Sequence, residues 1–111
     1  MNEASLLYVY GIVRSDFDAA RAPAGIDDAG VETSAQAGPT VALVSRLPVA
    51  SYGADPGERA SGDVSWLSPR AMAHDRVLTW AQEHGGVIPV PMFSLWASEQ
   101  SLAESLTKRQ S

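Results

Sequence analysis

Residues 87–99, VIPVPMFSLWASE, decide the fold of this sequence. The segment is as apolar as a buried strand, yet it contains Pro89 and Pro91, which cannot donate hydrogen bonds to a neighbouring strand. N–H groups two residues apart in a strand point to the same side, so both prolines remove donors from one side and leave Val90 to donate on the other. The pattern predicts an edge strand that is paired on one side and blunted on the other. A kink that redirects residues 92–96 is the alternative.

Both faces of this predicted strand are apolar, because its side chains alternate between two sides. The two sets are Ile88, Val90 and Met92 on one face, and Val87, Pro89, Pro91, Phe93 and Leu95 on the other. One face is expected to meet the helix that precedes the strand. The other face must meet a loop, the last helix or a partner protein, and this requirement points toward assembly.

Helices are predicted on both sides of this segment. Upstream, Ser68 followed by Pro69 is typical of a helix start, and Gly85-Gly86 ends the helix near His84. Downstream, Ser98 can cap a last helix. Leu102 and Leu106 then lie four residues apart on one face of that helix.

The first half of the chain supplies the remaining strands. Residues 6–13 are apolar at both parities, which indicates a central strand covered on both faces. Residues 31–45 form a predicted hairpin that turns at Gly38-Pro39. This order predicts one α+β domain over residues 1–111, resembling a modified ferredoxin-like fold whose first crossover is a loop and short helix. We expect an antiparallel sheet of about four strands with helices mainly on one face.

Composition excludes several classes of function. The 111 residues include no cysteine, which rules out disulfides, thiolate metal sites and thiol nucleophiles. Thirteen acidic and eight basic residues give a net charge of −5, so a nucleic-acid partner is not expected. The sequence has neither a long apolar span nor an apolar signal core, so we expect a cytoplasmic protein that does not enter a membrane.

No catalytic, cofactor or metal site is predicted. His74 and His84 are ten residues apart on the predicted helix, which is not a metal-ligand spacing. Neighbouring residues on a helix point about 100° apart, so His74 and Asp75 do not face each other. The preferred interpretation of His74 is a ring that packs on the sheet and donates one hydrogen bond. The alternative is a small ligand-binding module or enzyme that uses His74 in a cleft with Tyr8 or Tyr10.

Four passages, in order along the chain, resemble the gas vesicle protein F and L family. They are LLYVYGIV at 6–13, TVALVSRLPVASYG at 40–53, DVSWLSPRAMAHDRVL at 63–78 and VIPVPMFSLWASEQSL at 87–102. The resemblance is to the N-terminal domain of that family, which has a modified ferredoxin-like fold. Pro91 is a departure, because the family often has Arg or Lys there. Family members usually continue into a second α+β domain, so this chain is either a natural short form or a piece of a longer protein.

The resemblance implies a non-enzymatic accessory or minor structural protein, associated with gas vesicles, the gas-filled shells that give microbes buoyancy. Its expected partners are the small hydrophobic shell protein and other accessory proteins, with a homo-oligomer possible. The residues chosen for such contacts are Phe93, Leu95, Trp96 and Pro91, since large aromatic residues near a strand end are common interface anchors. A self-associating structural domain with no gas vesicle role is a further alternative.

Overall fold

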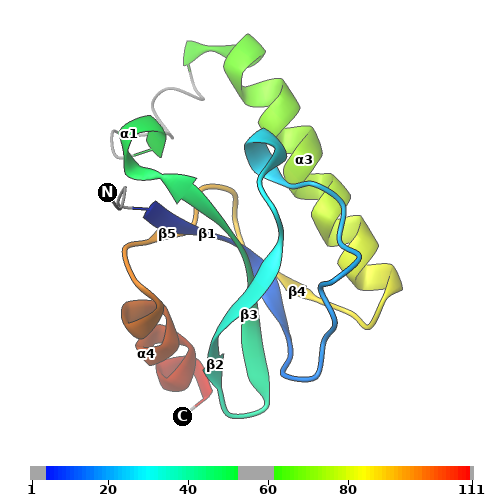
Figure 1. Ribbon diagram of the computed structural model, residues 1–111, viewed down its shortest axis with the longest axis vertical. Coiled ribbons are helices and arrows are strands. Elements are labelled where there is room, and N and C mark those ends of the chain that lie inside the picture. Colours follow the sequence, from blue (N-terminus) through cyan, green and yellow to red (C-terminus); the bar gives the residue numbers. More distant parts are fainter. Residues whose placement is uncertain (1–4, 53–61, 111) are drawn as a thin grey trace.

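The computed structural model describes residues 5–52 and 62–110 of the chain. Its centre is a five-stranded sheet whose strands run in the order β2-β3-β1-β4, with β5 on the same edge of β1 as β4 (Figure 1). The strands are β1 (Ser5–Arg14), β2 (Glu32–Ala37), β3 (Thr40–Pro48), β4 (Ile88–Pro89) and β5 (Leu95–Trp96). The helices are the 3₁₀ turn η1 (Ile26–Asp28), α1 (Val49–Tyr52), α3 (Val64–Glu83) and α4 (Glu99–Gln110).

The predicted α+β class is confirmed. All neighbouring strands are antiparallel, and the order strand, hairpin, helix, strand fits a modified ferredoxin-like fold. The first crossover is a loop with the short turn η1, as the sequence predicted. The sheet has five strands because residues 87–96, predicted as one strand, pair with β1 as two separate pieces.

The β1 strand is the centre of the sheet, and residues 7–11 and 13 within it are buried. It pairs with β3 along nearly its whole length, from Ser5 opposite Pro48 to Arg14 opposite Thr40. Its other edge pairs with β4 and β5. The continuous apolar pattern of residues 6–13 therefore marked a strand that is covered on both faces, as expected.

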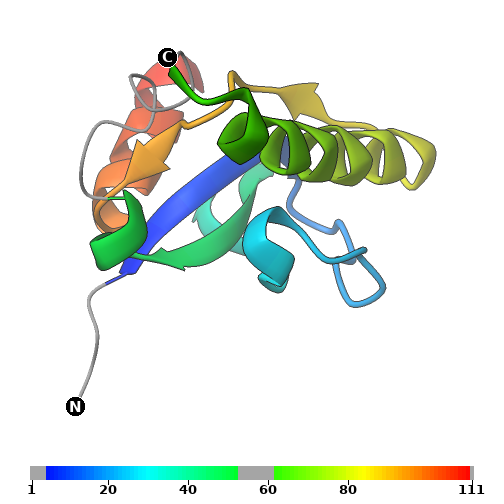
Figure 2. The ribbon, with the colours of Figure 1, turned by 90° about the horizontal axis from the view of Figure 1, so that it is seen from above.

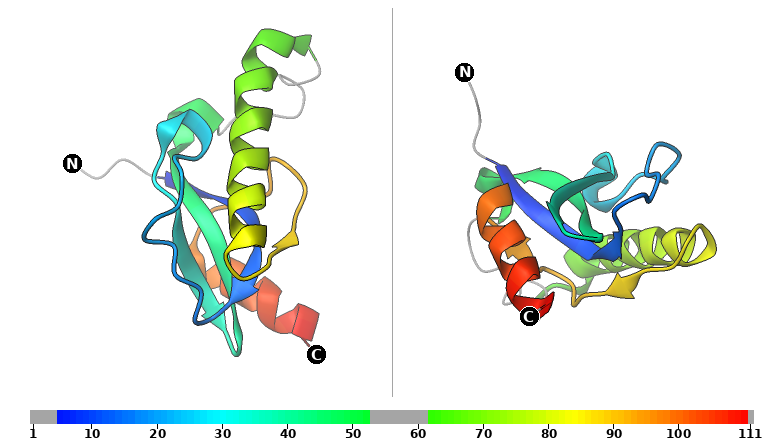
Figure 3. Two further views of the ribbon diagram at one scale, coloured as in Figure 1. Left: turned by 90° about the vertical axis from the view of Figure 1, so that its right-hand side faces the viewer. Right: turned by 90° about the horizontal axis from the view of Figure 1, so that it is seen from below.

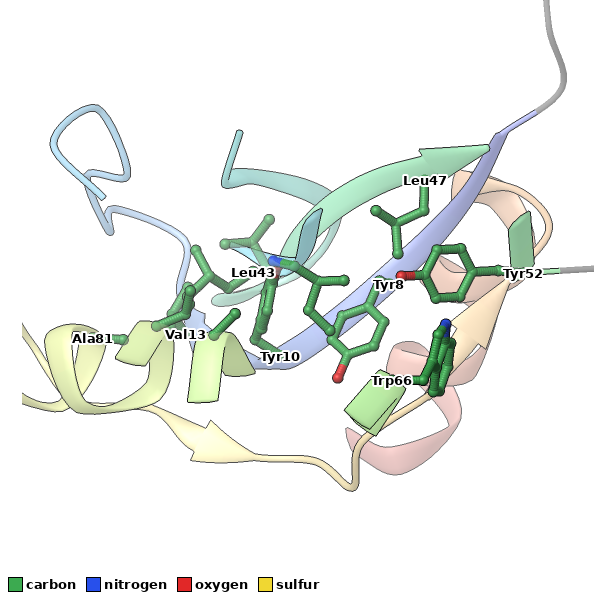
Figure 4. Packing of buried hydrophobic residues seen from close by; sticks show 12 residues of the cluster. Tyr8, Tyr10, Val13, Leu43, Leu47, Tyr52, Trp66 and Ala81 are labelled. Carbon is green, nitrogen blue, oxygen red and sulfur yellow. The ribbon is translucent and has the colours of Figure 1, made fainter. Parts of the chain in front are cut away.

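Helices cover both faces of the sheet, and Figures 2 and 3 show α3 and α4 on either side of β1. On one face α3, η1 and α1 cover Tyr8, Tyr10 and Leu43, whose packing with Trp66 is drawn in Figure 4. On the other face Leu102 and Leu106 of α4 cover a smaller cluster. The sheet residues of that cluster are Leu7, Val9, Ala37, Ala42 and Val44.

Helix α3 begins at Val64, four residues before the predicted start at Ser68. Asp63 is the cap, since its Oδ1 accepts a hydrogen bond from the Trp66 N–H at 3.1 Å. Pro69 consequently lies inside the helix, where it removes the donor that would bond the Ser65 carbonyl. Ser65 is exposed, so water can satisfy that carbonyl. The predicted end is confirmed, because Gly85 and Gly86 have φ angles of 144° and 92° and end the helix.

Helix α4 is capped as predicted by Ser98, whose Oγ accepts a hydrogen bond from the Ser101 N–H at 3.1 Å. A polar group also ties α4 to the hairpin. The Arg46 guanidinium of β3 donates to Glu32 of β2 and to Glu99 of α4, each at 2.6 Å. All three side chains are about half exposed, so these ion pairs add little stability and chiefly set the position of α4.

Candidate functional site

Residues 87–96, called the edge segment below, pair with β1 along one side only. The Val90 N–H donates to the Tyr10 carbonyl at 3.1 Å, and the Ser94 carbonyl accepts from the Val9 N–H at 3.0 Å. Between these two bonds the chain turns away from the sheet at residues 92–93, where Phe93 has a φ of 63°. The predicted edge strand and the predicted kink are therefore both present.

The outer side of the edge segment offers no backbone donor to another strand between residues 87 and 91. The Val87 N–H is bonded to the Gln82 side chain at 3.3 Å, and Pro89 and Pro91 have no N–H. The Pro91 carbonyl accepts a hydrogen bond from Ser94 Oγ at 2.7 Å. The apolar side chain of Ile88 is nevertheless 67% exposed here. This edge can contact a partner through side chains, but it cannot extend the sheet by ordinary strand addition.

The structure separates the four residues predicted as contacts. Phe93 and Leu95 pack against the core under α3, and the Phe93 ring stacks on Trp66 with centroids 5.5 Å apart. Trp96 belongs to the opposite cluster, under α4. Pro91 and Trp96 line one recess of about 60 Å³ between the edge segment and α4. Only Pro91 and Trp96 therefore share a surface feature.

Each face of the edge segment is partly covered within the chain, while Ile88, Pro89 and Pro91 stay exposed. Val87, Phe93 and Leu95 pack under α3, while Val90 and Trp96 pack with α4. The last helix, one of the three covers expected for the second face, is the one observed. Contacts within the chain therefore account for the apolar side chains of Val87, Phe93, Leu95, Val90 and Trp96, but not for that of Ile88.

His74 is a buried core residue and is only 7% exposed. Its Nδ1 lies 2.8 Å from the Tyr8 hydroxyl oxygen, and the Tyr10 ring lies against it with centroids 5.7 Å apart. Burial lowers the pKa of His74, an effect partly offset by a hydrogen bond to the Val90 backbone and by the charge of Asp75. This is the structural interpretation of His74 that the sequence favoured. Across residues 5–52 and 62–110, no three metal-ligating side chains come together.

A polar cluster that the sequence did not reveal joins η1, α1 and α3. The Arg70 guanidinium pairs with Asp27 Oδ1 at 3.1 Å, donates to the Tyr52 hydroxyl at 3.0 Å and lies 4.3 Å from the Trp66 ring centre. Tyr52 in turn donates a short hydrogen bond to Asp27. Burial, then this bond, raises the pKa of Tyr52 to about 12. No periodic spacing links these positions, which explains why sequence reasoning missed them.

A recess of about 360 Å³ lies beside this cluster, between η1 and α3. Asp27 and Asp28 form one wall, with φ angles of 53° and 60°, and Pro69 and Met72 lie in the other. The charges of Asp27 and Arg70 are already paired with each other. We therefore assign the cluster a structural task, which is to hold η1 and α1 against α3.

Comparisons with known proteins yield one match. Residues 6–111 match the family model described as gas vesicle synthesis protein GvpL/GvpF. Searches of curated proteins and of solved structures found no match. In the part of the chain that the structure describes, no helix is both long and apolar enough to cross a bilayer.

Proposed function

The chain belongs to the gas vesicle synthesis protein GvpL/GvpF family, and from that premise we propose that it is a non-enzymatic accessory or minor structural protein of gas vesicle assembly. The match over residues 6–111 carries this proposal. The proposed partners are the small hydrophobic shell protein and other accessory proteins of the vesicle. The position of His74 supports the non-enzymatic assignment, because its ring is 7% exposed and its Nδ1 is hydrogen-bonded to the Tyr8 hydroxyl.

The proposed task is to cover apolar surface on shell subunits before they polymerise. Such a protein must contact a β-rich or apolar partner without joining an open-ended sheet itself. The edge segment suits this task, because it presents Ile88, Pro89 and Pro91 to solvent but no backbone donor between residues 87 and 91. Contacts through side chains remain available, while strand addition at this edge is discouraged.

The four predicted contact residues remain part of the proposal, but they differ in how directly they can contact a partner. Pro91 and Trp96 line the recess beside α4 and can touch a partner directly. Phe93 and Leu95 are packed against the core, so replacing them tests folding as well as contact. Ile88, with its side chain 67% exposed, is a better probe of the surface than either.

Co-purification with the small shell protein encoded in the same genome tests this function. The wild-type chain should retain the shell protein, and Ile88→Asp combined with Pro91→Asp should abolish retention without unfolding the domain. Met72→Asp is the matched control, since Met72 is 68% exposed on α3, away from the edge segment. Failure of the wild type to retain the shell protein contradicts the proposed contact. Retention of the shell protein by the double variant would show that the contact lies on another surface of the domain.

A further inference from the structure

The short strand β4 is a ridge between two neighbouring recesses at the edge of the sheet. One recess, of about 380 Å³, lies between β4 and the last turns of α3. The other, of about 330 Å³, lies between β4 and the end of β1, beside the turn that follows α3. Pro89 lines the first recess and Ile88 lines the second, while Gln82 and Val87 line both. The two recesses therefore adjoin, and they form one surface that crosses β4.

The centre of this surface is apolar and exposed. The side chain of Ile88 is 67% exposed, and Pro89 beside it is exposed as well. Leu78 of α3 and Ile12 of β1, one in each recess, are half-buried. An exposed apolar ridge with apolar side chains in the hollow on either side of it has the shape of a contact surface.

One charged residue of each sign flanks the ridge. Glu83 lines the recess beside α3, and Arg14 lines the recess beside β1. Among the described residues, none forms an ion pair with Glu83. Arg14 lies 3.2 Å from Asp16, but the two side chains are 77% and 71% exposed, so this ion pair is weak and Arg14 can take another partner.

This arrangement of charges is complementary to a second copy of the same surface. When two identical surfaces meet about a two-fold axis, residue i of each copy contacts residue j of the other. An axis at the ridge sets Ile88 of one copy against Ile88 of the other. It also brings Glu83 of each copy to Arg14 of the other, so that both charges are paired twice. A partner of unrelated sequence would not require one acid and one base on the two sides of β4.

We infer that the chain forms a two-fold dimer through β4, in which the Ile88 side chains pack together and Glu83 of each copy pairs with Arg14 of the other. Pro89 has no N–H and the Val87 N–H is bonded to Gln82, so the copies meet through side chains and their sheets do not join. Each copy uses its whole surface in this contact, and assembly therefore ends at the dimer. The dimer does not rest on the proposed gas vesicle role, although a shell protein bound at Ile88 would compete with it.

Sedimentation equilibrium of the purified chain, with no shell protein present, tests the dimer. Between about 10 and 500 µM, a range that spans the affinity of a small interface, the mass should rise from 11.7 kDa toward twice that value. Ile88→Asp should stay monomeric with an unchanged circular dichroism spectrum, because the side chain is exposed. A wild type that stays monomeric, a mass that rises past the dimer, or a dimer that persists in Ile88→Asp would overturn the inference.

An exchange of charges tests the two-fold geometry. Glu83→Arg or Arg14→Glu alone should weaken the dimer about tenfold, because each reversal turns two attractive contacts into repulsive ones. The variant with both changes should bind within about threefold of the wild type, since both contacts form again with the charges exchanged. Glu104→Arg is the matched control, because it makes the same charge change on the exposed side of α4 and should leave the dimer unaltered. Single variants that dimerise like the wild type, or a double variant that does not recover, would contradict the reciprocal contact.

Discussion

Tyr10 is the residue at which the loop before β2 meets the sheet. Its hydroxyl oxygen lies 2.7 Å from Ser45 Oγ and accepts a hydrogen bond from the Ile26 N–H at 3.0 Å. Ser45 donates onward to the Gly30 carbonyl at 2.9 Å. The chain passes so close to this group that a Cβ on Gly25 would lie 2.1 Å from the Tyr10 hydroxyl oxygen. Gly25 therefore has a steric requirement that its φ of −93° alone does not reveal.

Replacing Gly25 by alanine should lower the free energy of unfolding by about 1–3 kcal/mol, because the Tyr10 hydroxyl must move out of its hydrogen bonds. Urea denaturation followed by circular dichroism measures this change. Gly30→Ala is the matched control, since nothing lies within 4 Å of a Cβ there, and it should change stability much less. Equal effects of the two substitutions would contradict the packing argument.

Alkaline pH should destabilise the domain through its buried tyrosines. Burial raises the pKa of Tyr8 and of Tyr10 above the ordinary value of 10.0. An unfolded chain therefore loses these protons first, and the stabilisation is complete below pH 10 and lost as pH rises toward the folded pKa values. The free energy of unfolding, measured in urea between pH 8 and pH 11.5, should be constant at first and fall above pH 10. Phenolate absorbance that develops in the folded domain near pH 10, without loss of stability, would disprove this.

The protection of the sheet edge against self-association depends on the two prolines of the edge segment. Pro89→Val with Pro91→Val restores two N–H groups on the outer side, where the Val87 donor is already used by Gln82. The double variant should self-associate more than the wild type at equal concentration, as sedimentation velocity would measure. Pro23→Val is the control, because Pro23 lies in a loop outside the sheet. A double variant no more associated than the wild type would mean that something else protects this edge.

The elements also show what local sequence patterns can predict. Strand β1, the β2–β3 hairpin and the cap of α4 at Ser98 follow from alternation and capping rules that act over a few residues, and each is observed. The predicted start of α3 was wrong, because Ser68-Pro69 and Asp63 are both good helix-start signals and local rules do not rank them. The split of the edge segment occurs at Phe93, whose ring packs against Tyr8 and Trp66, residues that no local pattern links to it.

In the candidate site, too, features set by neighbouring residues could be predicted from the sequence. The spacing of the two prolines correctly predicted that the edge segment pairs along one side, because the direction of each N–H group depends only on adjacent residues. The division of Phe93 and Trp96 between opposite sides of the sheet also follows from alternation, since Val87, Phe93 and Leu95 pack on one side and Val90 and Trp96 on the other. Contacts between Asp27 and Arg70 join residues far apart in sequence and required the fold itself.

At the scale of the whole molecule, the two faces of the sheet are covered unequally. One face has α3, η1, α1 and a large aromatic core, whereas the other has α4 with two buried leucines, Leu102 and Leu106. The Arg46 ion pairs that also hold α4 are half exposed and add at most about 1 kcal/mol. The attachment of α4 therefore depends chiefly on those two leucines.

Leu102→Ala with Leu106→Ala should release α4 and expose Leu7 and Val9. Each substitution of a buried leucine costs about 2–5 kcal/mol, so the pair should unfold a domain of ordinary stability or leave it binding a hydrophobic dye. Dye fluorescence and thermal unfolding measure the two outcomes. Lys108→Ala, on the exposed side of α4, should leave both unchanged. Wild-type stability in the double variant would show that α4 is not the cover of this face.

The position of β1 at the centre of the sheet has a consequence for a chain that is still being made on the ribosome. Its first partner, β3, is complete at Pro48, but its other edge is closed only by residues 88–96, and Leu7 is covered only after Leu106 has emerged. At synthesis rates of about 5–20 residues per second, that face stays uncovered for several seconds. The nascent domain thus passes through an interval in which a chaperone or a freshly made partner subunit can reach an apolar surface that the finished fold conceals.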